Sequence, residues 1–322
     1  MPSVGYTLSA ISLIWVFRGF NFRQTLSDLE SLDWRYVTIA VIFDLSVYLS
    51  HAWRWNLLLR PVARPSYWRS VQAIYIGLYA NEILPLRTGE LIRCYLLSHW
   101  NDIPISLAIS SAGIERIFDG IWLVVALLIT TQLTPLPRYL IDGTEVMGIG
   151  LCVLLGLLIF IAVHKQRAHA VFSETSWASG LRHIVEGIHA MGNWRTMLAV
   201  AGASLIYLLL QIVPVWALME GYGLDLSIGV AAAVYIILRL GTVIPNAPGN
   251  AGLYQFFCVL GLGLFDVPKS TAVGFSLMMF GVLTLPLLVG GFVAMAFTGL
   301  KLGDIRARAR TSVHSTVEVA SE

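Results

Sequence analysis

The stretch Leu84-Pro85-Leu86-Arg87-Thr88-Gly89 interrupts an apolar segment that runs from about residue 67 to 98. A second segment, at about 226–265, is interrupted by a similar unit, Pro245-Asn246-Ala247-Pro248-Gly249. Proline removes a backbone donor and clashes with the preceding turn, whereas glycine adopts backbone angles closed to other residues. Each segment is therefore predicted to be a broken helical hairpin, either re-entrant or a pair of short crossings. The alternative is a kinked helix with no special role.

The interrupted segments belong to a longer internal repeat. Trp34-Arg35 recurs as Trp194-Arg195, and Pro85-x-x-x-Gly89 recurs as Pro245-x-x-x-Gly249, both at an offset of 160 residues. Asp102-Ile103-Pro104 recurs as Asp266-Val267-Pro268 at an offset of 164. These landmarks indicate two related halves, 1–145 and 146–310. Gly/Pro-interrupted segments in corresponding places of two halves are typical of transport proteins.

The composition indicates an integral membrane protein. Hydrophobic residues make up 57% of the chain and charged residues 12%, and the mean hydropathy is +0.75. About 20 apolar residues are needed to cross roughly 30 Å of hydrocarbon. The expected fold is an all-α polytopic membrane protein with two hairpins and six crossing helices, at about 4–20, 36–59, 105–131, 146–163, 196–219 and 272–300.

Basic residues in short connections predict the orientation, because such loops are retained in the cytoplasm. The segments 54–69, 164–195 and 301–310 are rich in arginine and lysine, whereas 132–145 and 220–225 hold a single arginine. Both termini are then cytoplasmic, and the halves form inverted-topology repeats in the inner membrane. Residues 165–195 are expected to form an amphipathic surface connector, and 311–322 a disordered cytoplasmic tail.

The ionisable residues around the first break are the main candidates for function, because charge at membrane depth is costly. Arg87 and Arg93 offer planar guanidinium groups that suit a phosphate headgroup, and Glu82 and Glu90 can balance them. The alternatives are a buried ion-pair network that only orients the hairpin, or side chains that extend to the cytoplasmic surface.

A second charged group lies on the helix that begins near residue 105. Glu115 and Arg116 each lie within about one turn of Asp119, and the group can pair with the hairpin arginines across a shared cavity. In the second half, the corresponding segment Phe275 to Pro286 has no charge, and the second hairpin keeps only Arg239 before its break.

Asp44 and His51 are spaced to share one face of the second crossing helix. A membrane aspartate beside a histidine can relay protons. The interpretation we favour is internal pairing with Arg54.

Several classes of site lack sequence support. The chain has no phosphate-binding loop, no zinc-protease or serine-hydrolase motif and no dinucleotide fingerprint. Cys94, Cys152 and Cys258 form no disulfide framework or metal motif. We therefore expect no catalytic residue, metal, cofactor or nucleic-acid partner.

The first break lies within Asn81-Glu82-Ile83-Leu84-Pro85-Leu86-Arg87-Thr88-Gly89-Glu90-Leu91-Ile92-Arg93. This stretch resembles the N-x-x-x-P-x-R-x-G-E-x-x-R signature of the lysylphosphatidylglycerol synthase transmembrane-region family, also called flippase-like-domain proteins. Glu115-Arg116-Ile117-Phe118-Asp119 is similar to the family's E-R-x-x-D element, and Pro245-Asn246-Ala247-Pro248-Gly249-Asn250-Ala251-Gly252 to its P-x-x-P-G-x-x-G element.

The resemblance implies a lipid-handling protein of the bacterial or archaeal cytoplasmic membrane. The best-understood relatives move aminoacylated phosphatidylglycerol between leaflets, and others accompany hopanoid or polyprenyl-linked glycan pathways. The synthases also carry a soluble aminoacyltransferase domain that this sequence lacks, so aminoacyl transfer is not expected. Gln255 stands where the family often has an acid, which argues against proton coupling at that position.

We therefore expect a lipid translocator whose hairpins meet near the membrane midplane and whose partners are lipids with an anionic headgroup or a phosphate. Headgroup binding is assigned to Arg87, Arg93 and Arg116, and charge balance or proton coupling to Glu82, Glu90, Glu115 and Asp119. The hairpin breaks are assigned to Asn81, Pro85, Gly89, Pro245, Asn246, Pro248, Gly249 and Gly252.

Two other functions stay open. One is a membrane transferase with a lipid-linked donor, in which Glu90 or Asp119 acts as base and the arginines hold the donor phosphate. The other is an accessory subunit that presents lipid to a separate lipid-modifying enzyme.

Overall fold

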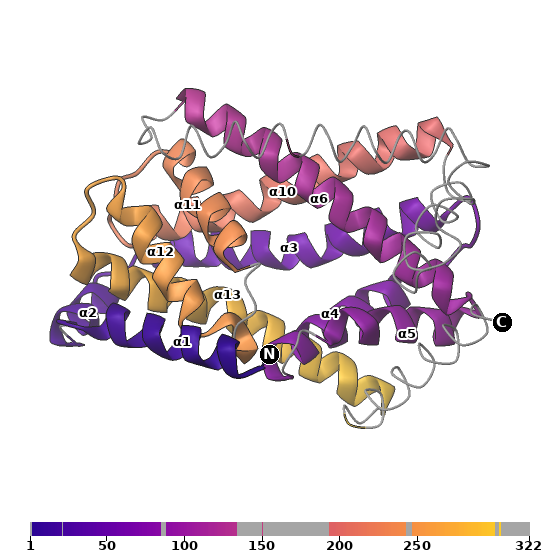
Figure 1. Cartoon of the computed structure of the whole chain (residues 1–322), viewed down its shortest axis with the longest axis horizontal. Helices are drawn as coiled ribbons and strands as arrows, with labels where there is room; N and C mark the ends of the chain where they lie inside the picture. Colours follow the sequence, from indigo (N-terminus) through magenta and orange to yellow (C-terminus); the bar gives the residue numbers. More distant parts are fainter. Residues whose placement is uncertain are drawn as a thin grey trace.

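The computed structural model describes residues 2–20, 22–84, 88–133, 150, 193–242, 247–299 and 303. These ranges contain helices and no strand (Figure 1). The predicted crossing at 146–163, apart from Gly150, the tail 311–322 and most of the connector 165–195 lie outside the described residues. The helices are α1 (Pro2–Phe17), α2 (Phe22–Glu30), α3 (Trp34–Leu59), α4 (Tyr67–Ile83), α5 (Gly89–Asn101), α6 (Ile105–Leu133), α10 (Trp194–Gly221), α11 (Ile228–Gly241), the short 3-10 helix η2 (Pro248–Asn250), α12 (Leu253–Gly263) and α13 (Lys269–Thr298).

The predicted all-α membrane fold is confirmed. Within the described ranges, α3, α10 and α13 are long and apolar enough to cross a membrane, by length and composition alone. At 1.5 Å per residue a helix of this length spans about 39 Å or more, which exceeds the roughly 30 Å of a hydrocarbon core. The helices α1 and α6 occupy the segments predicted as the crossings at 4–20 and 105–131.

The helices α3 and α10 lie side by side and antiparallel. The backbone N–H of Asp33, at the start of α3, donates to the carbonyl oxygen of Gly221, at the end of α10, at 3.0 Å. The two helices begin alike, because the side chains of Asp33 and Asn193 accept from the backbone N–H of Arg35 and Arg195. The two occurrences of Trp-Arg therefore begin corresponding helices that run in opposite directions.

The order of elements after these two helices also corresponds. A broken pair, α4 and α5, precedes α6 in the first half, and α11, η2 and α12 precede α13 in the second. Asp102 and Asp266 both adopt left-handed backbone angles, with φ of 53° and 59°, just before α6 and α13. Aspartate and asparagine are among the few non-glycine residues that adopt this region readily. The exact boundary between the halves and their membrane orientation stay predictions.

Two glycines allow the two helices of the first hairpin to pack closely. A Cβ atom on Gly89 would lie 1.8 Å from the carbonyl oxygen of Gly77, so α4 and α5 approach each other more closely than side chains would allow. The side chain of Asn81 accepts from the backbone N–H of Gly89 at 2.8 Å and so satisfies a donor at the start of α5. Pro85 and Arg87 lie outside the described residues.

The second hairpin breaks over a longer distance. Gly249 and Gly252 have φ of 69° and 91°, angles that glycine adopts without steric cost. The side chain of Gln255 accepts from the backbone N–H of Gly252 at 2.8 Å and stabilises the start of α12. Pro248 begins η2, whereas Pro245 and Asn246 lie outside the described residues.

The two hairpins contact each other. The end of α4 packs against η2, and the carboxylate of Glu82 lies 3.2 Å from the position that a Cβ on Gly249 would take. The helix α4 also contacts α13, where Gly290 lies against Tyr75 and Gly291 lies against Tyr79. The predicted meeting of the hairpins is therefore present, and its depth in the membrane stays a prediction.

Replacing Gly89 with alanine should destabilise the protein, because its methyl group would collide with backbone of α4 rather than with a movable side chain. Overpacking of this kind costs roughly 1–3 kcal/mol. The matched control is Gly202→Ala in α10, where nothing lies within 4 Å of the added methyl group. Thermal unfolding in detergent should show a lower unfolding temperature for Gly89→Ala than for the native protein and no decrease for Gly202→Ala. Equal unfolding temperatures of the two variants would contradict the packing described.

Candidate functional site

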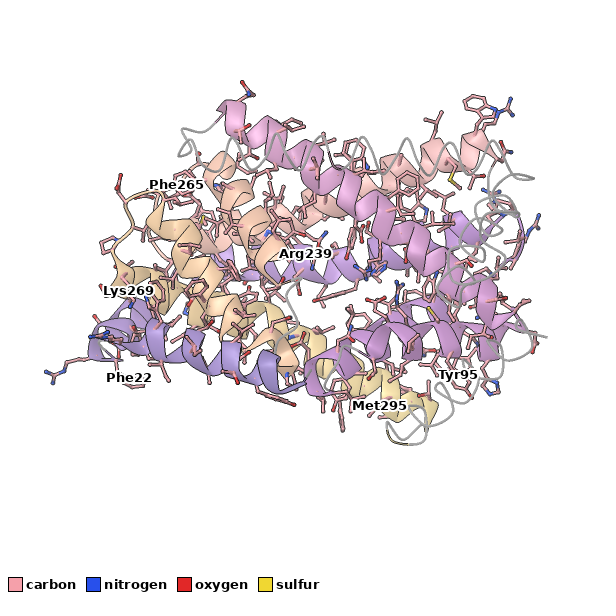
Figure 2. All side chains as sticks on the ribbon, in the orientation of Figure 1. Phe22, Tyr95, Arg239, Phe265, Lys269 and Met295 are labelled. Atoms are coloured by element: carbon pink, nitrogen blue, oxygen red, sulfur yellow. The ribbon has the colours of Figure 1, made fainter. Side chains whose placement is uncertain are left out.

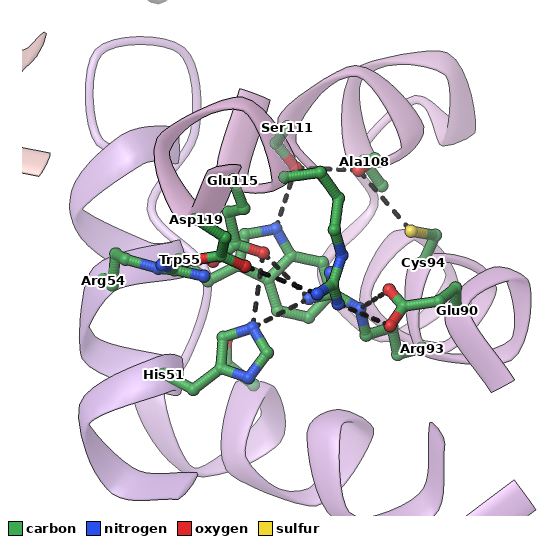
Figure 3. A network of polar contacts seen from close by, with 12 residues as sticks. His51, Arg54, Trp55, Glu90, Arg93, Cys94, Ala108, Ser111, Glu115 and Asp119 are labelled. Atoms are coloured by element: carbon green, nitrogen blue, oxygen red, sulfur yellow. Dashed lines mark hydrogen bonds and ion pairs between the residues drawn. The ribbon is translucent and has the colours of Figure 1, made fainter. Parts of the chain in front are cut away.

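Six ion pairs form a closed ring of alternating charge between α3, α5 and α6 (Figure 3). Each of three arginines contacts two carboxylates, and each of three carboxylates contacts two arginines. Going round the ring, the members are Arg54, Glu115, Arg93, Glu90, Arg116 and Asp119. The formal charge of the ring is zero, so its members compensate one another without help from elsewhere.

Glu115 lies at the centre of the buried side of the ring. Its carboxylate accepts from Arg54 Nε at 3.2 Å and from Arg93 Nη1 at 2.9 Å. Arg54 and Glu115 are fully buried, and Arg93 is 1% exposed. Because unpaired charges inside a membrane protein are very costly, these three side chains depend on one another for their place in the fold.

The other side of the ring is more accessible. Arg116 donates to Glu90 at 2.6 Å and to Asp119 at 3.3 Å, and its side chain is 45% exposed. Glu90 also accepts from Arg93 Nε at 2.8 Å, and Asp119 also accepts from Arg54. Arg116, Glu90 and Asp119 are therefore the ring members that a ligand can reach.

Aromatic rings support the buried arginines. The guanidinium of Arg93 lies 4.5 Å from the ring centre of Trp55, and that of Arg54 lies 4.5 Å from the ring centre of Tyr207. The indole N–H of Trp55 donates to Ser111 at 2.8 Å. These contacts hold the planar groups in fixed orientations and join α10 to the ring.

The expected pairing of Asp44 with Arg54 is wrong. Arg54 pairs with Glu115 and Asp119 instead, and no cation of the described residues lies within ion-pair distance of Asp44. The physical reason is distance, because ten residues of helix separate the two side chains by about 15 Å. His51, on the same face, contacts Glu115 at 3.4 Å.

A cavity of about 510 Å³ lies beside the accessible side of the ring. Side chains of both halves line it, from α3, α4, α5 and α6 and from α10, α11, η2 and α12. Its charged lining residues are Glu82, Glu90, Arg116, Asp119 and Arg239. The sequence predicts a cavity between the two broken hairpins, and residues of both hairpins line this one.

The predicted site residues occupy different layers of this arrangement. Glu82, Glu90, Arg116, Asp119 and Asn81 line the cavity, whereas Arg93 and Glu115 lie in the buried side of the ring. The charges on α6 were predicted to pair with the hairpin arginines across a shared cavity. Arg93 does pair with Glu115, at 2.9 Å, but the pair is buried and does not line the cavity. Arg87 lies outside the described residues, so its role stays a prediction.

Arg239 is a further functional candidate, which was not among the residues assigned to the site from the sequence. It lies in the last turn of α11 and lines the same cavity as the accessible residues of the ring (Figure 2). Within the described part of the chain, no carboxylate lies within ion-pair distance of its guanidinium. The sequence signal was present, because Arg239 is a lone charge inside an apolar helix.

Aromatic residues of the second half complete the cavity. Tyr207, Tyr235 and Tyr254 line it together with Ser204 and Gln211. They provide hydroxyl and amide groups that can hydrogen-bond a polar ligand. No sequence pattern distinguishes these tyrosines from those that pack in the core.

In the described ranges, no group of three or more histidine, cysteine or acidic side chains is arranged to hold a metal ion.

Replacing Glu115 with glutamine should destabilise the protein strongly, because Arg54 and Arg93 would keep their buried charges and lose a shared partner. Breaking a buried pair in this way costs about 3–5 kcal/mol. Arg116→Gln is the comparison, since its exposed pairs are each worth no more than about 1 kcal/mol. Thermal unfolding in detergent measures the stability of both variants. A smaller loss of stability for Glu115→Gln than for Arg116→Gln would contradict the ring as described.

Comparison with known proteins gives a family and several distant relatives. The profile described as the lysylphosphatidylglycerol synthase TM region matches residues 3–291. The UPF0104 membrane protein MJ1595 of Methanocaldococcus jannaschii is 22% identical, over 84% of this chain and 87% of the relative. A UPF0104 membrane protein of Methanothermobacter thermautotrophicus is 22% identical, over 70% and 74%.

A third relative is longer than this chain. Glycosyltransferase AglD of Haloferax volcanii is 22% identical over 98% of this chain, which corresponds to 56% of AglD. No solved structure matches the chain. The profile match covers nearly the whole sequence, including both broken hairpins and the charged ring, and the chain therefore belongs to the lysylphosphatidylglycerol synthase transmembrane-region family of multi-pass membrane proteins.

Proposed function

We propose that this protein moves a lipid with a phosphate or another anionic headgroup between the leaflets of the cytoplasmic membrane, with both of its termini in the cytoplasm. The observation that carries the proposal is Arg239, a cation on the cavity wall that no described carboxylate neutralises. A guanidinium in a membrane cavity is costly without an anion, and a phosphate oxygen is a strong partner for it.

The dimensions of the cavity support a headgroup rather than a whole lipid. Small-molecule sites usually measure about 300–1,000 Å³, and the cavity of about 510 Å³ falls within that range. Acyl chains would then remain in the surrounding hydrocarbon while the headgroup passes through the protein. Tyr207, Tyr235 and Gln211 offer hydrogen bonds to the headgroup on its way.

The charged ring has two roles in this proposal. Its buried side, Arg54, Glu115 and Arg93, holds α3, α5 and α6 together. Its accessible side presents Arg116 as a second cation across the cavity from Arg239, with Glu90 and Asp119 as counter-charges when no lipid is bound. Arg93 then acts by positioning the ring, whereas Arg87 remains a proposed headgroup ligand.

The contact between the hairpins suggests how the pathway opens. Glu82, at the end of α4, lies against Gly249 in η2, so the two broken segments meet at the wall of the cavity. Movement of one hairpin relative to the other would expose the cavity to one leaflet at a time. Broken helices at the interface of two repeats are used in this way by other transporters.

Arg239→Gln should slow headgroup-dependent lipid exchange in proteoliposomes while the protein stays folded. The lost hydrogen bond to a charged group is worth about 1.5–3 kcal/mol, which corresponds to a loss of roughly tenfold or more. The assay follows headgroup-labelled lipids with a surface quencher. Arg195→Gln, at an exposed position at the start of α10, is the matched control. Equal exchange by Arg239→Gln and Arg195→Gln would overturn the assignment.

Arg87→Ala should give the same phenotype, because we expect this residue of the first hairpin to bind the same headgroup. Slower exchange with a native unfolding temperature is the expected result. Normal exchange would remove Arg87 from the proposal without affecting Arg239.

The similarity to AglD favours a second candidate, a role in glycosyl transfer to or from a lipid, either as a transferase or as an accessory subunit. Product formation from a lipid-linked donor and an acceptor in detergent distinguishes this candidate from the first. A transferase works without a bilayer, whereas a translocator gives no product there. Product that depends on Glu90 or Asp119 would replace the transport proposal.

A further inference from the structure

Asp44 is a buried carboxyl group that the proposed site does not use. It lies in the middle of α3 and is 8% exposed. One of its oxygens, Oδ1, is 3.5 Å from the hydroxyl of Tyr48, and the other, Oδ2, is buried and has no hydrogen-bond partner among the described residues. Asp44 thus differs from Glu90, Glu115 and Asp119, each of which contacts two arginines.

Among the described residues, tyrosines lie near Asp44 and no cation lies within ion-pair distance of it. Tyr48 lies on α3 itself, and the ring centre of Tyr75, on α4, lies 5.1 Å from that of Tyr48. The ring centre of Tyr207, on α10, lies 5.2 Å from that of His51. On α13, which holds Tyr75 in place at Gly290, the sole charged residue is Lys269 at its first position.

An ionised carboxylate in such surroundings is unstable, because burial removes its water and no described cation replaces it. A buried acid without a partner therefore binds a proton instead of keeping its charge. The three ring acids need no proton, since each lies between two guanidinium groups. Of the described acids, Asp44 is the one whose surroundings favour a proton on these grounds.

The same face of α3 leads from Asp44 to the cavity. Tyr48 and His51 follow Asp44 at spacings of four and three residues, so the three side chains lie in line along the helix. His51 lines the cavity and contacts Glu115, and its Nδ1 atom is buried without a partner among the described residues. Hydroxyl and imidazole groups can both accept and donate a proton.

We propose that Asp44 is the proton-binding site that couples lipid movement to the proton gradient. Asp44 takes up one proton from water in the cavity while the cavity is open to one side of the membrane, and it holds that proton while its side chain is buried beside Tyr48 and Tyr75. It returns the proton to cavity water, along the face that carries Tyr48 and His51, when the hairpins move and the cavity opens to the other side. This inference rests on the proposed lipid transport, and it supplies the energy source for that transport.

The protonation of Asp44 can be tested without any lipid substrate. Infrared spectroscopy of the native protein in nanodiscs at neutral pH should show the C=O band of a protonated carboxyl group, and Asp44→Asn should lack it. Because asparagine has nearly the shape of the protonated acid, Asp44→Asn should also keep the native unfolding temperature. Identical infrared spectra of the two proteins would overturn the proposal.

The coupling is tested in proteoliposomes with an imposed pH gradient. Native protein and Asp225→Asn should exchange labelled lipid faster with the gradient than without it. Asp225 is the matched control, because it is exposed and its left-handed backbone suits asparagine. Asp44→Asn should exchange lipid at the same rate with and without the gradient. If the gradient accelerates lipid exchange by Asp44→Asn as much as it accelerates exchange by the native protein, the coupling is overturned.

The two proposals fail in different ways. If the native protein exchanges lipid and Arg239→Gln exchanges it more slowly, the transport proposal stands whatever Asp44→Asn does. If the native protein exchanges no lipid under either condition, the transport proposal and the coupling fail together. The infrared band then decides only whether Asp44 carries a proton.

Discussion

The fold of this protein depends on the need to neutralise charge where water is absent. Arg54, Glu115 and Arg93 are buried on three different helices, and none of them is stable there without the others. The ring that they form with Glu90, Arg116 and Asp119 fixes α5 and α6 against α3. Because one side of the ring faces the cavity, the same constraint that holds the first half together also places charge at the site.

The two halves share a plan but differ in their chemistry. The second half has no counterpart of the ring among its described residues, and its close contacts come from glycines and aromatic rings. Gly241 packs against Phe257, Trp15 of α1 packs edge-on against Phe256, and Lys269 donates to the carbonyl oxygen of Trp15. The first half supplies the compensated charges, and the second supplies Arg239 and all three tyrosines that line the cavity. A site at the junction therefore receives different groups from the two halves, although their helices correspond.

The sequence was sufficient to predict the described long helices and the two breaks, because these features follow from local patterns of apolar residues, proline and glycine. It also suggested that charges on α6 would pair with Arg93, because both groups are charged residues in apolar segments that need partners. It was not sufficient to place Arg54, which lies 61 residues from its partner Glu115 and reaches it only through the packing of α3 on α6. Spacing along one helix suggested Asp44 as the partner of Arg54, but a shared face does not bring side chains ten residues apart into contact. Arg239 was visible as a charge, but the direction in which it points depends on how α11 packs, which no local pattern specifies.

If the protein moves lipid, the headgroup must enter the cavity between the hairpins. This can be measured by labelling the protein in native membranes with phospholipids that carry a photoreactive group on the headgroup, and by mapping the attachment sites by mass spectrometry. We expect attachment within the cavity wall, on peptides that contain Tyr207, Tyr235 or Arg239. Attachment confined to outward-facing residues such as Phe292 and Phe297 would contradict this expectation, because those side chains are exposed on the surface of α13.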